Sequence, residues 1–517
     1  MNSLAIRAHR DAGQVDHPGP PSDQTRKAVL TQPRKAVLTQ PLAILLGLTL
    51  LGAALRFGTL NVQSIWLDES ATMILVRRGF SGMLSHLAAS ESSPPLYYML
   101  VWLWTKIFGI GPLGFRSLSA LVGTITIPVM YAAGRTFSSR AGLWAAALTA
   151  VNPAMFYYSQ EARAYALLVL FAAGAFVFWQ QALRQPSRRN LMLWAAMSSL
   201  AILTHYFAAF LFLPELLFLA RRLGYRRILI PTGSVLIVGL ALAPLALRER
   251  ADGKSNWIEE ASLPSRIAES VKQFAVGLYG PLEIVSAAVV IVLAVGAGVL
   301  MFTRGREQDR DRCGVIVFVA AISLLIPLLL AAAHIMDVYD GRNVIATWIP
   351  LAVLVAAGLA TTCPGRIGPL LGVCLCTISL LAIAAVEVKP AYQRDNWRGV
   401  SEALSRPQAQ RVIVGPELSE APLSIYMPHI ALASGRVLAR ELDFVALRTR
   451  QSGGSPRAPV VLTRPPAGFR LQSVKRTETY AVSRFIAPRA LALQAGVLRR
   501  LSGEPHAEVI LDQTGES

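Results

Sequence analysis

Long runs of apolar residues alternate with short basic segments along most of this chain. The runs are about 15 to 22 residues long, which suits helices that cross a hydrocarbon layer about 30 Å thick. Five segments between runs are rich in Arg, namely 135–140, 184–189, 221–227, 304–312 and the neighbourhood of Arg366. Short basic loops tend to stay in the cytoplasm, so we place these five there. The pattern predicts a polytopic α-helical membrane protein.

The composition agrees with this class and excludes a soluble protein. Hydrophobic residues make up 53% of the chain and charged residues 16%, with a mean hydropathy of +0.46. A net charge of +19 would suggest nucleic acid as the partner of a soluble protein, but here Lys and Arg cluster in short loops between apolar runs. We therefore expect a membrane and no nucleic acid. All four cysteines, Cys313, Cys363, Cys374 and Cys376, lie in or beside apolar runs, so we expect no disulfide and no cysteine metal site.

The number of spans follows from placing the loops on alternating sides. If the segment before Leu42 is cytoplasmic, residues 58–93 lie outside, and an odd number of crossings must precede the basic loop at Arg135. Two apolar runs occur between these segments. Residues 95–110 are short, rich in aromatic residues and contain Lys106, so we assign them to an interfacial amphipathic helix. This predicts about eleven spans, with the N terminus inside and the C terminus outside.

The hydrophilic ends of the chain predict two further regions. Residues 1–40 contain the octapeptide RKAVLTQP at 26–33 and again at 34–41, and we predict a disordered cytoplasmic tail rather than a cleavable signal. Residues 41–388 are the predicted transmembrane domain. Residues 389–517 are the predicted outer domain, a small α/β fold with a helix at 397–405, strands at 411–415 and 459–463, and a strand or hairpin at 475–486.

The most informative polar motif is Asp68-Glu69-Ser70, in the first hydrophilic loop after the first span. Carboxylates beside a bilayer are costly and tend to serve substrate, ion or proton chemistry. An alternative is that Asp68 only caps a helix that begins near Ser70. Other acidic and aromatic residues collect on the same outer face, including 158–163, His205-Tyr206, 337–343 and the region after Lys389.

Several segments in this order resemble bacterial members of the protein O-mannosyltransferase and aminoarabinose-transferase superfamily, which are GT-C glycosyltransferases. The segments are LRFGTL, IWLDES, SSPPLYY, GFRSLSA, NPAMFYYSQEARAYAL, LTHYFA, DGRNVIATWIPLAVLVAAGLA and YQRDNWRGV, spread over residues 41–405. The resemblance implies an integral enzyme of a bacterial inner membrane that takes a sugar from a polyprenyl-phosphate donor. The acceptor, a lipid, glycan or protein, would receive the sugar on the periplasmic side.

The chemistry of such a donor defines what the site must supply. Polyprenyl phosphate is a good leaving group, so the reaction needs a base for the acceptor hydroxyl and positive charge for the departing phosphate. We predict Asp68 as the base, with inversion at the anomeric carbon. Glu69 is the second catalytic candidate. Adjacent residues on a helix point about 100° apart and cannot both face one substrate atom, so the alternative is that Glu69 orients a neighbouring arginine.

Arginines on the outer face are the candidates for the phosphate, because a guanidinium matches phosphate oxygens in a bidentate manner. The leading candidate is Arg342, followed by Arg163, Arg116 and Arg56; interfacial snorkelling is the alternative for each. Related enzymes often carry Tyr after the arginine at the Arg342 position. Here that residue is Asn343, which leaves details of the lipid-phosphate or sugar contact open.

The remaining candidates lie near two other outer turns. Glu161 and Arg163 could form a structural ion pair, or Glu161 could bind sugar hydroxyls or share a metal with Asp68. His205 and Tyr206 could line the same pocket, although a lone His is more often a satisfied turn residue. No closed His and Cys metal set is present, and we assign no cofactor. Asp68 and Glu161 could together hold a divalent cation, although their spacing alone does not support one.

Two other classes of protein remain open as alternatives. A secondary transporter should show internal repeats and charges near the middle of the membrane, whereas these charges lie at the outer ends of the runs. A polysaccharide ligase or polymerase would also use polyprenyl-linked sugars. Such proteins usually carry a large outer loop between spans, whereas this chain has its soluble mass at the C terminus. A structural scaffold would not explain the Asp-Glu pair and the outer arginines.

Overall fold

The computed structural model describes residues 34–253, 256–361, 366–404, 407, 410–448, 458–504 and 506–513. Most of the predicted tail, including the first octapeptide copy, lies outside these residues, as does Cys363. The other three cysteines are free thiols. The first helix described begins at Arg34, in the second copy of the octapeptide.

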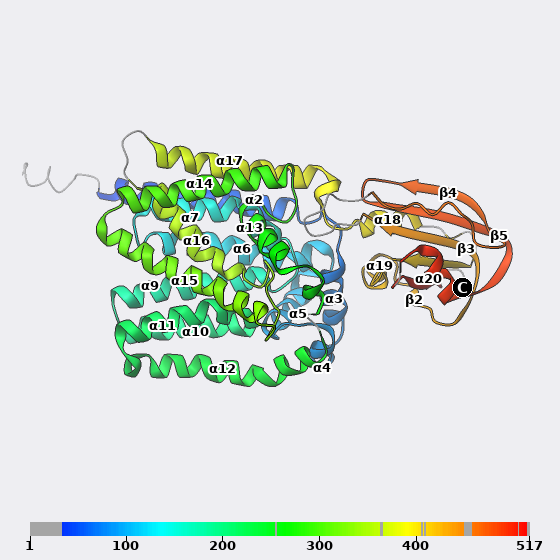
Figure 1. Ribbon diagram of the computed structural model, residues 1–517, viewed down its shortest axis with the longest axis horizontal. Coiled ribbons are helices and arrows are strands. Elements are labelled where there is room, and N and C mark those ends of the chain that lie inside the picture. The colour runs from blue at the N-terminus through cyan, green and yellow to red at the C-terminus, as the bar shows by residue number, and fades with distance from the viewer. Residues whose placement is uncertain are drawn as a thin grey trace, which may run out of the picture. The chain divides into compact units, whose positions relative to one another are not determined.

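Helices account for most of residues 34–388 (Figure 1). Their bounds are α2 Arg34–Gly58, α3 Leu67–Arg77, α4 Phe80–Ser90, α5 Leu96–Phe108, α6 Pro112–Gly134, α7 Ser139–Val151, α8 Pro153–Ser159, α9 Tyr165–Arg184, α10 Arg188–Thr204, α11 Ala209–Leu223, α12 Tyr225–Ala251, α13 Leu263–Val276, α14 Glu283–Arg304, α15 Glu307–Ala332, α16 Trp348–Leu359 and α17 Ile367–Val388. Short 3₁₀ turns occur at Tyr206–Ala208, Asn256–Glu260, Ile345–Thr347 and Pro390–Tyr392.

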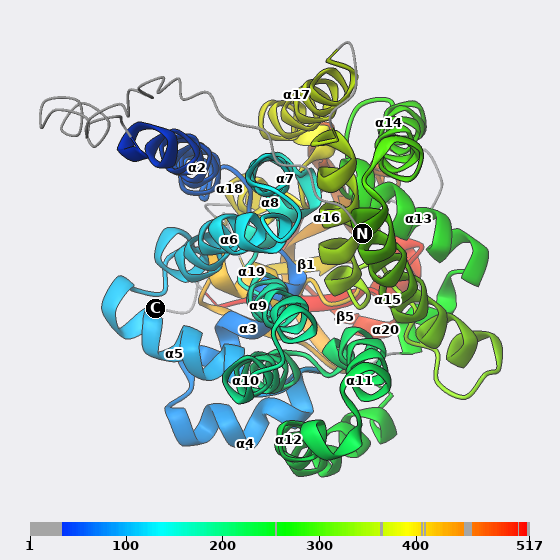
Figure 2. The same cartoon turned by 90° about the vertical axis from the view of Figure 1, so that its left-hand side faces the viewer.

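Seven of the described helices are long and apolar enough to cross a membrane: α2, α6, α9, α12, α14, α15 and α17. The helices α7, α10, α11 and α16 pack among them, as the nearly end-on view in Figure 2 shows, but they are shorter, with 12 to 17 residues each. Helix α10 also buries polar side chains, among them Ser198 and Thr204. The protein is therefore a multi-pass membrane protein, while the number of eleven spans stays a prediction.

Helix α5 corresponds to the segment that we predicted to be interfacial. It has 13 residues, so it is about 20 Å long at 1.5 Å per residue, which is short of a hydrocarbon core about 30 Å thick. One side of it buries Tyr97, Tyr98 and Val101, while Leu103 and Ile107 are exposed. Together with α3 and α4 it lies at one end of the helical bundle (Figure 1).

The basic loops lie at the other end of the bundle. Arg184 and Arg312, from two separate basic segments, both donate to the carbonyl of Thr136 in a third, at 3.2 and 3.4 Å. The segments at the far end of the bundle carry the predicted site residues Glu69, Glu161, His205 and Arg342. The charge pattern of the sequence thus corresponds to two distinct ends of the bundle.

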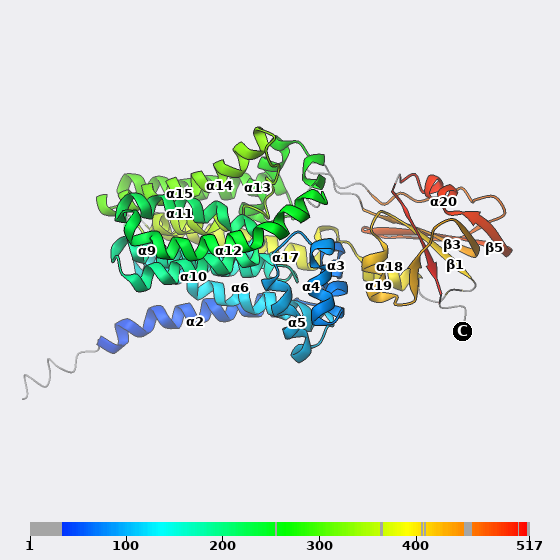
Figure 3. The same cartoon turned by 90° about the horizontal axis from the view of Figure 1, so that it is seen from below.

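Residues 389–513 contain a six-stranded sheet with short helices on both faces (Figure 3). The strands are β1 Arg411–Gly415, β2 Ile430–Leu432, β3 Arg436–Leu447, β4 Arg470–Arg476, β5 Tyr480–Gln494 and β6 Glu508–Asp512, in the order β2-β6-β1-β3-β5-β4. Among the paired strands that the structure describes, only β1 and β3 are parallel. The helices are α18 Trp397–Leu404, α19 Glu420–Tyr426 and α20 Ala495–Ser502.

Alternating residues of the strands pack on opposite faces of this sheet. Val412 and Val414 of β1 pack with Leu498 of α20, whereas Ile413 packs with Trp397 of α18 and Leu423 of α19. The predicted helix at 397–405, strand at 411–415 and hairpin at 475–486 are confirmed. The strand predicted at 459–463 is wrong, because these residues are irregular: two prolines follow soon after, and none of the described strands pairs with them.

Candidate active site

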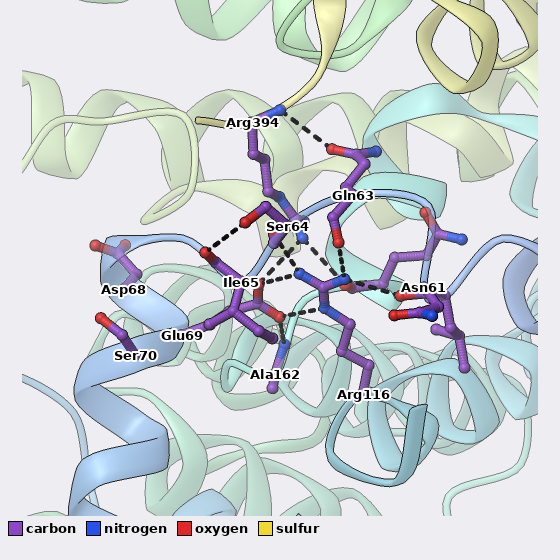
Figure 4. A network of polar contacts seen from close by, with 12 residues as sticks. Asn61, Gln63, Ser64, Ile65, Asp68, Glu69, Ser70, Arg116, Ala162 and Arg394 are labelled. Atoms are coloured by element: carbon purple, nitrogen blue, oxygen red, sulfur yellow. Dashed lines mark hydrogen bonds and ion pairs between the residues drawn. The ribbon is translucent and has the colours of Figure 1, made fainter. Parts of the chain in front are cut away.

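The two carboxylates of the Asp-Glu pair have different surroundings because α3 turns them in different directions. The helix begins at Leu67, with Trp66 as its N-cap, so Asp68 and Glu69 lie in the first turn, where the helix dipole favours negative charge. The alternative in which Asp68 caps a helix starting near Ser70 is therefore wrong. Glu69 is fully buried, whereas the Asp68 side chain is 22% exposed. Figure 4 shows Asp68 pointing away from the network around Glu69.

Glu69 is the centre of a buried ion-pair network (Figure 4). Arg116 of α6 donates to both of its oxygens, at 2.7 and 2.5 Å, and the backbone N–H of Ala162 donates at 3.0 Å. Arg394 approaches the same carboxylate at 3.5 Å. Burial alone would raise the pKa of Glu69, but Arg116 and Arg394 outweigh burial and hold the pKa below its usual range. Glu69 is thus a permanent anion that joins three segments of the chain.

Arg116 has its remaining donors directed at the backbone of the loop between α2 and α3. Its Nη1 donates to the carbonyls of Leu60 and Gln63, and its Nη2 to that of Ser64, each at 2.8 Å. The side chain is 1% exposed. This arrangement matches the orienting role that the sequence left open for Glu69, and it occupies the guanidinium with protein partners.

This network predicts that Glu69→Gln lowers stability more than it changes chemistry. The substitution leaves the buried guanidinium of Arg116 without its anion, and breaking a buried pair in this way costs about 3–5 kcal/mol. We expect a lower yield of folded protein and a lower Tm, measured in detergent by size-exclusion chromatography and thermal unfolding. Asp68→Asn is the matched control, because Asp68 is partly exposed, and it should fold normally. An unchanged Tm for Glu69→Gln would contradict the role of the network.

Asp68 pairs with Arg342, which lies 274 positions later in the chain. Nη1 of Arg342 donates to Asp68 Oδ2 at 2.8 Å, and its Nε is 3.4 Å from Asp340 Oδ1. The guanidinium also stacks on the ring of Trp257, 4.2 Å from its centroid. The Arg342 side chain is 22% exposed. A partly open carboxylate and a partly open guanidinium therefore lie side by side at this end of the bundle.

Arg163 pairs with a carboxylate that sequence reasoning did not select. Its Nη1 donates to Glu91 at the end of α4, at 2.5 Å, and to Thr72 of α3 at 3.0 Å. The alternative of a structural Glu161–Arg163 ion pair is wrong, because Glu91 takes this place. The segment SSPPLYY follows Glu91 directly in the sequence, so the motif marked this region without identifying the acid.

Glu161 is buried at 1% exposure beside these charged groups. Its Oε2 has no hydrogen-bond partner among the residues that the structure describes. Burial raises the pKa of Glu161 to about 7; Arg394 and Arg163 oppose this shift, whereas Asp68 and Glu69 add to it. A buried carboxyl with an open acceptor is suited to a hydroxyl of a bound molecule.

The raised pKa of Glu161 predicts how stability depends on pH. A carboxyl with a pKa of about 7 when folded and about 4.5 when unfolded contributes a loss of stability as the pH rises from 4.5 to 7. We expect Glu161→Gln, which keeps the side chain neutral, to match the wild type in Tm near pH 4.5 and to exceed it near pH 8. Thermal unfolding of both proteins across this range tests the sign. If the Tm of both proteins changed with pH in parallel, Glu161 would be ionised across this pH range and its pKa would not be raised.

Arg56 lies inside the bundle and donates to two backbone carbonyls at the end of α7, where a following proline interrupts the helical hydrogen bonds. Its Nη1 and Nη2 donate to the carbonyls of Ala150 and Thr149 at the end of α7, each at 2.9 Å. Pro153 has no N–H for the carbonyl of Thr149, and the N–H of Ala154 bonds to Asn152 instead. Arg56 is fully buried. It therefore caps α7 where the chain turns into α8.

His205 lies at a buried turn between α10 and α11. Its Nδ1 accepts a long hydrogen bond of 3.4 Å from the N–H of Phe207, and its ring lies 5.7 Å from that of Tyr165. Burial lowers the pKa of His205 to about 3, and the charges of Arg163 and Arg342 contribute to this shift, so the imidazole is neutral. Tyr206 is less buried, and the charge of Glu249 in α12 acts on it.

Arg394 is a further site residue that was not selected from the sequence, although it lies in the motif YQRDNWRGV. It is 5% exposed and comes from the segment after the last long helix. Its guanidinium stacks on Tyr157 at 4.2 Å and donates to the carbonyls of Tyr157 and Gln160. Its charge also acts on Glu161.

An apolar groove of about 400 Å³ lies among the later helices of the bundle. Its lining includes Phe274 of α13, Val290 and Val295 of α14, Trp348 of α16 and Leu375 of α17. Among its few polar lining residues is Tyr339, three positions before Arg342. The groove thus extends along the bundle from the loop that carries Arg342.

Among the described residues, no three or more His, Cys, Asp or Glu side chains are grouped as a metal site would require. Asp68 instead has Arg342 as its nearest partner.

The chain is similar to known proteins in part of its sequence and in its fold. The family described as dolichyl-phosphate-mannose-protein mannosyltransferase matches residues 92–247. The structure is similar to that of ArnT from Cupriavidus metallidurans bound to undecaprenyl phosphate, with a TM-score of 0.50 and 13% identity over 77% of this chain and 85% of that one. For ArnT in the apo state the TM-score is 0.49, with 15% identity over 79% and 85%. No curated protein sequence matches.

These findings confirm the resemblance to the GT-C glycosyltransferase superfamily that the motifs indicated. The fold of this chain, a mostly helical membrane domain with a C-terminal sheet domain, is similar to that of ArnT. The family match shows similarity to mannosyltransferases over residues 92–247.

Proposed function

We propose that this protein transfers a sugar from a polyprenyl-phosphate donor to an acceptor hydroxyl, with inversion at the anomeric carbon. The observation that carries the proposal is the contact between Asp68 and Arg342. Of the charged residues predicted from the sequence, these two are both partly exposed and paired with each other at 2.8 Å. Together they offer a base and a cation on one surface, as the reaction requires.

Asp68 is the proposed base. As the acceptor oxygen attacks the anomeric carbon, its proton passes to Asp68, and the bond between that carbon and the phosphate oxygen breaks. The electron pair leaves with the phosphate, so one displacement inverts the configuration. Glu69 cannot share this role in the arrangement described, because both of its oxygens are bonded to buried groups.

Arg342 is the proposed ligand of the leaving phosphate. In the free protein its guanidinium neutralises Asp68, and stacking on Trp257 fixes its plane. A donor phosphate would compete with Asp68 for the same guanidinium, because both are oxyanions. Binding of the donor would thus release Asp68 to receive the proton of the acceptor. We assign structural roles to Arg116 and Arg56, whose donors are already bonded within the protein.

The apolar groove is the proposed place of the polyprenyl chain. An isoprenoid tail needs an apolar surface that is continuous with the membrane, and the groove is lined almost entirely by apolar side chains. The similar ArnT was crystallised with undecaprenyl phosphate bound. Here the groove would place the phosphate end of such a lipid near Tyr339 and Arg342.

We place this reaction on the periplasmic side of a bacterial inner membrane, because the five basic loops lie at the opposite end of the bundle. The proposal is tested by incubating purified protein with polyprenyl-phosphate sugars and a membrane extract as acceptor. Release of free polyprenyl phosphate that depends on the acceptor supports it. Turnover of polyprenyl-diphosphate-linked sugars in a parallel incubation, with release of polyprenyl diphosphate, would instead indicate a ligase or polymerase of lipid-linked glycans. The acceptor is then identified from its glycosylated product by gel electrophoresis or mass spectrometry.

A further inference from the structure

The loop between α2 and α3 leads directly to Asp68, and the C-terminal domain binds one side of it. Arg116 holds the carbonyls of Leu60, Gln63 and Ser64. Other groups of the loop, including the N–H of Ile65 and side-chain oxygens of Asn61, Gln63 and Ser64, have partners among residues 394–426, more than 300 positions later in the chain.

Tyr426, the last residue of α19, makes the central contact. Its hydroxyl accepts a hydrogen bond from the N–H of Ile65 at 2.8 Å and shares another with Ser64 Oγ at 3.2 Å. The N–H of Arg398 donates to the same Ser64 oxygen at 3.0 Å. Ile65 is fully buried, so its N–H has no access to water as a substitute partner.

Two arginines extend the contact to the rest of the loop. The guanidinium of Arg398 donates to the backbone and side-chain oxygens of Asn61, at 3.0 and 2.9 Å. The N–H of Arg394 donates to Gln63 Oε1 at 3.3 Å. The loop is therefore bonded to a transmembrane helix through Arg116 and to the C-terminal region through these residues.

Apolar packing reinforces the hydrogen bonds. Ile425 and Tyr426 of α19 pack against the buried cluster that includes Ile65 and, from α3, Met73 and Leu75. The C-terminal domain thus contributes side chains to the core that supports α3.

We propose that the C-terminal domain is a positioning element for α3, and that Tyr426 is its principal positioning residue. Loops between helices are usually the mobile parts of a fold, whereas a base must be held within a fraction of an ångström of its working position. Tyr426 bonds Ile65, which lies three residues before Asp68, and so fixes the backbone just before α3 begins. The catalytic consequence rests on the proposed function of Asp68.

The test compares Tyr426→Phe with Ser424→Ala in the full-length protein. Tyr426→Phe removes only the hydroxyl that bonds Ile65 and Ser64. Ser424→Ala removes a hydroxyl from the same helix, but that hydroxyl bonds only the carbonyl of Ala421. Hydrogen–deuterium exchange of the segment 60–68 and the kcat and KM for polyprenyl-phosphate sugar are measured for both variants.

We expect exchange of segment 60–68 to become about tenfold faster in Tyr426→Phe, because a buried N–H loses its partner. We expect kcat per folded molecule to fall about tenfold, with KM for the donor unchanged, because misplacing a base affects the chemical step. Ser424→Ala should match the wild type in both measurements. A purely structural role would lower yield or Tm while leaving kcat per folded molecule at the wild-type value.

Unchanged exchange in Tyr426→Phe would overturn the proposal, and so would faster exchange with an unchanged kcat. The exchange measurement needs no substrate. It therefore shows whether Tyr426 holds the loop even if the wild type proves inactive. A wild type that transfers no sugar from any polyprenyl-phosphate donor would contradict the proposed function, not the role of Tyr426 in holding the loop.

Discussion

Asp68→Asn should lose roughly 10²- to 10⁴-fold in kcat while the protein still folds and binds donor lipid. The amide cannot take a proton from the acceptor, yet it keeps the size of the carboxylate and can still accept a hydrogen bond from Arg342. Because Asp68 is partly exposed and bonds one arginine, the substitution should leave the helical bundle intact. Turnover by the purified variant, measured as release of polyprenyl phosphate, tests this expectation.

The matched control is Asp252→Asn, which changes an exposed carboxylate after α12. Its activity should equal that of the wild type. If Asp68→Asn were as active as this control, Asp68 would not be the base, and Glu161, the other carboxyl near the same arginines, would be tested next.

Arg342→Ala should be nearly inactive, with a loss of roughly 10²- to 10³-fold in kcat/KM, because the leaving phosphate loses its charged donor. Arg342→Lys should lose about tenfold or more, since an ammonium supplies charge without the planar fork and without stacking on Trp257 in the same way. Both variants should bind polyprenyl phosphate more weakly. Binding of the lipid to purified variants separates this role from a general loss of folding.

Arg310→Ala is the control for this series, because Arg310 is exposed near the start of α15, at the basic end of the bundle. It should keep both lipid affinity and turnover. Wild-type lipid affinity in Arg342→Ala would move the phosphate site elsewhere, and Arg163 would be the next candidate because it lies beside Asp68 at 3.3 Å from its carbonyl.

The arginines illustrate how far sequence reasoning reached. Four were selected because they lie near the outer ends of apolar runs, and Arg342 was ranked first. In the structure, Arg56 caps a broken helix, Arg116 holds Glu69 and Arg163 holds Glu91. Arg342 pairs with the more open carboxylate. Their different roles depend on which partner lies opposite each guanidinium, and those partners are distant in the chain.

In the C-terminal domain, too, local patterns predicted the elements but not their contacts with the rest of the chain. Its helix at 397–404 and its first strand could be recognised from local patterns, and so could the hairpin of β4 and β5. The contact of Tyr426 with Ile65 joins positions 361 residues apart. No local pattern encodes it.

Local sequence patterns were enough to predict a membrane-embedded helical domain followed by a small α/β domain, and the motifs carried the resemblance to GT-C glycosyltransferases. Hydropathy, basic loops and strand alternation are local properties, so they can be read along the chain. The different surroundings of the two carboxylates depend on the folded chain: Arg116 seals Glu69, while Asp68 stays partly open beside Arg342. Burial and ion pairing are properties of neighbours in space, and here those neighbours are 47 and 274 positions apart in the chain.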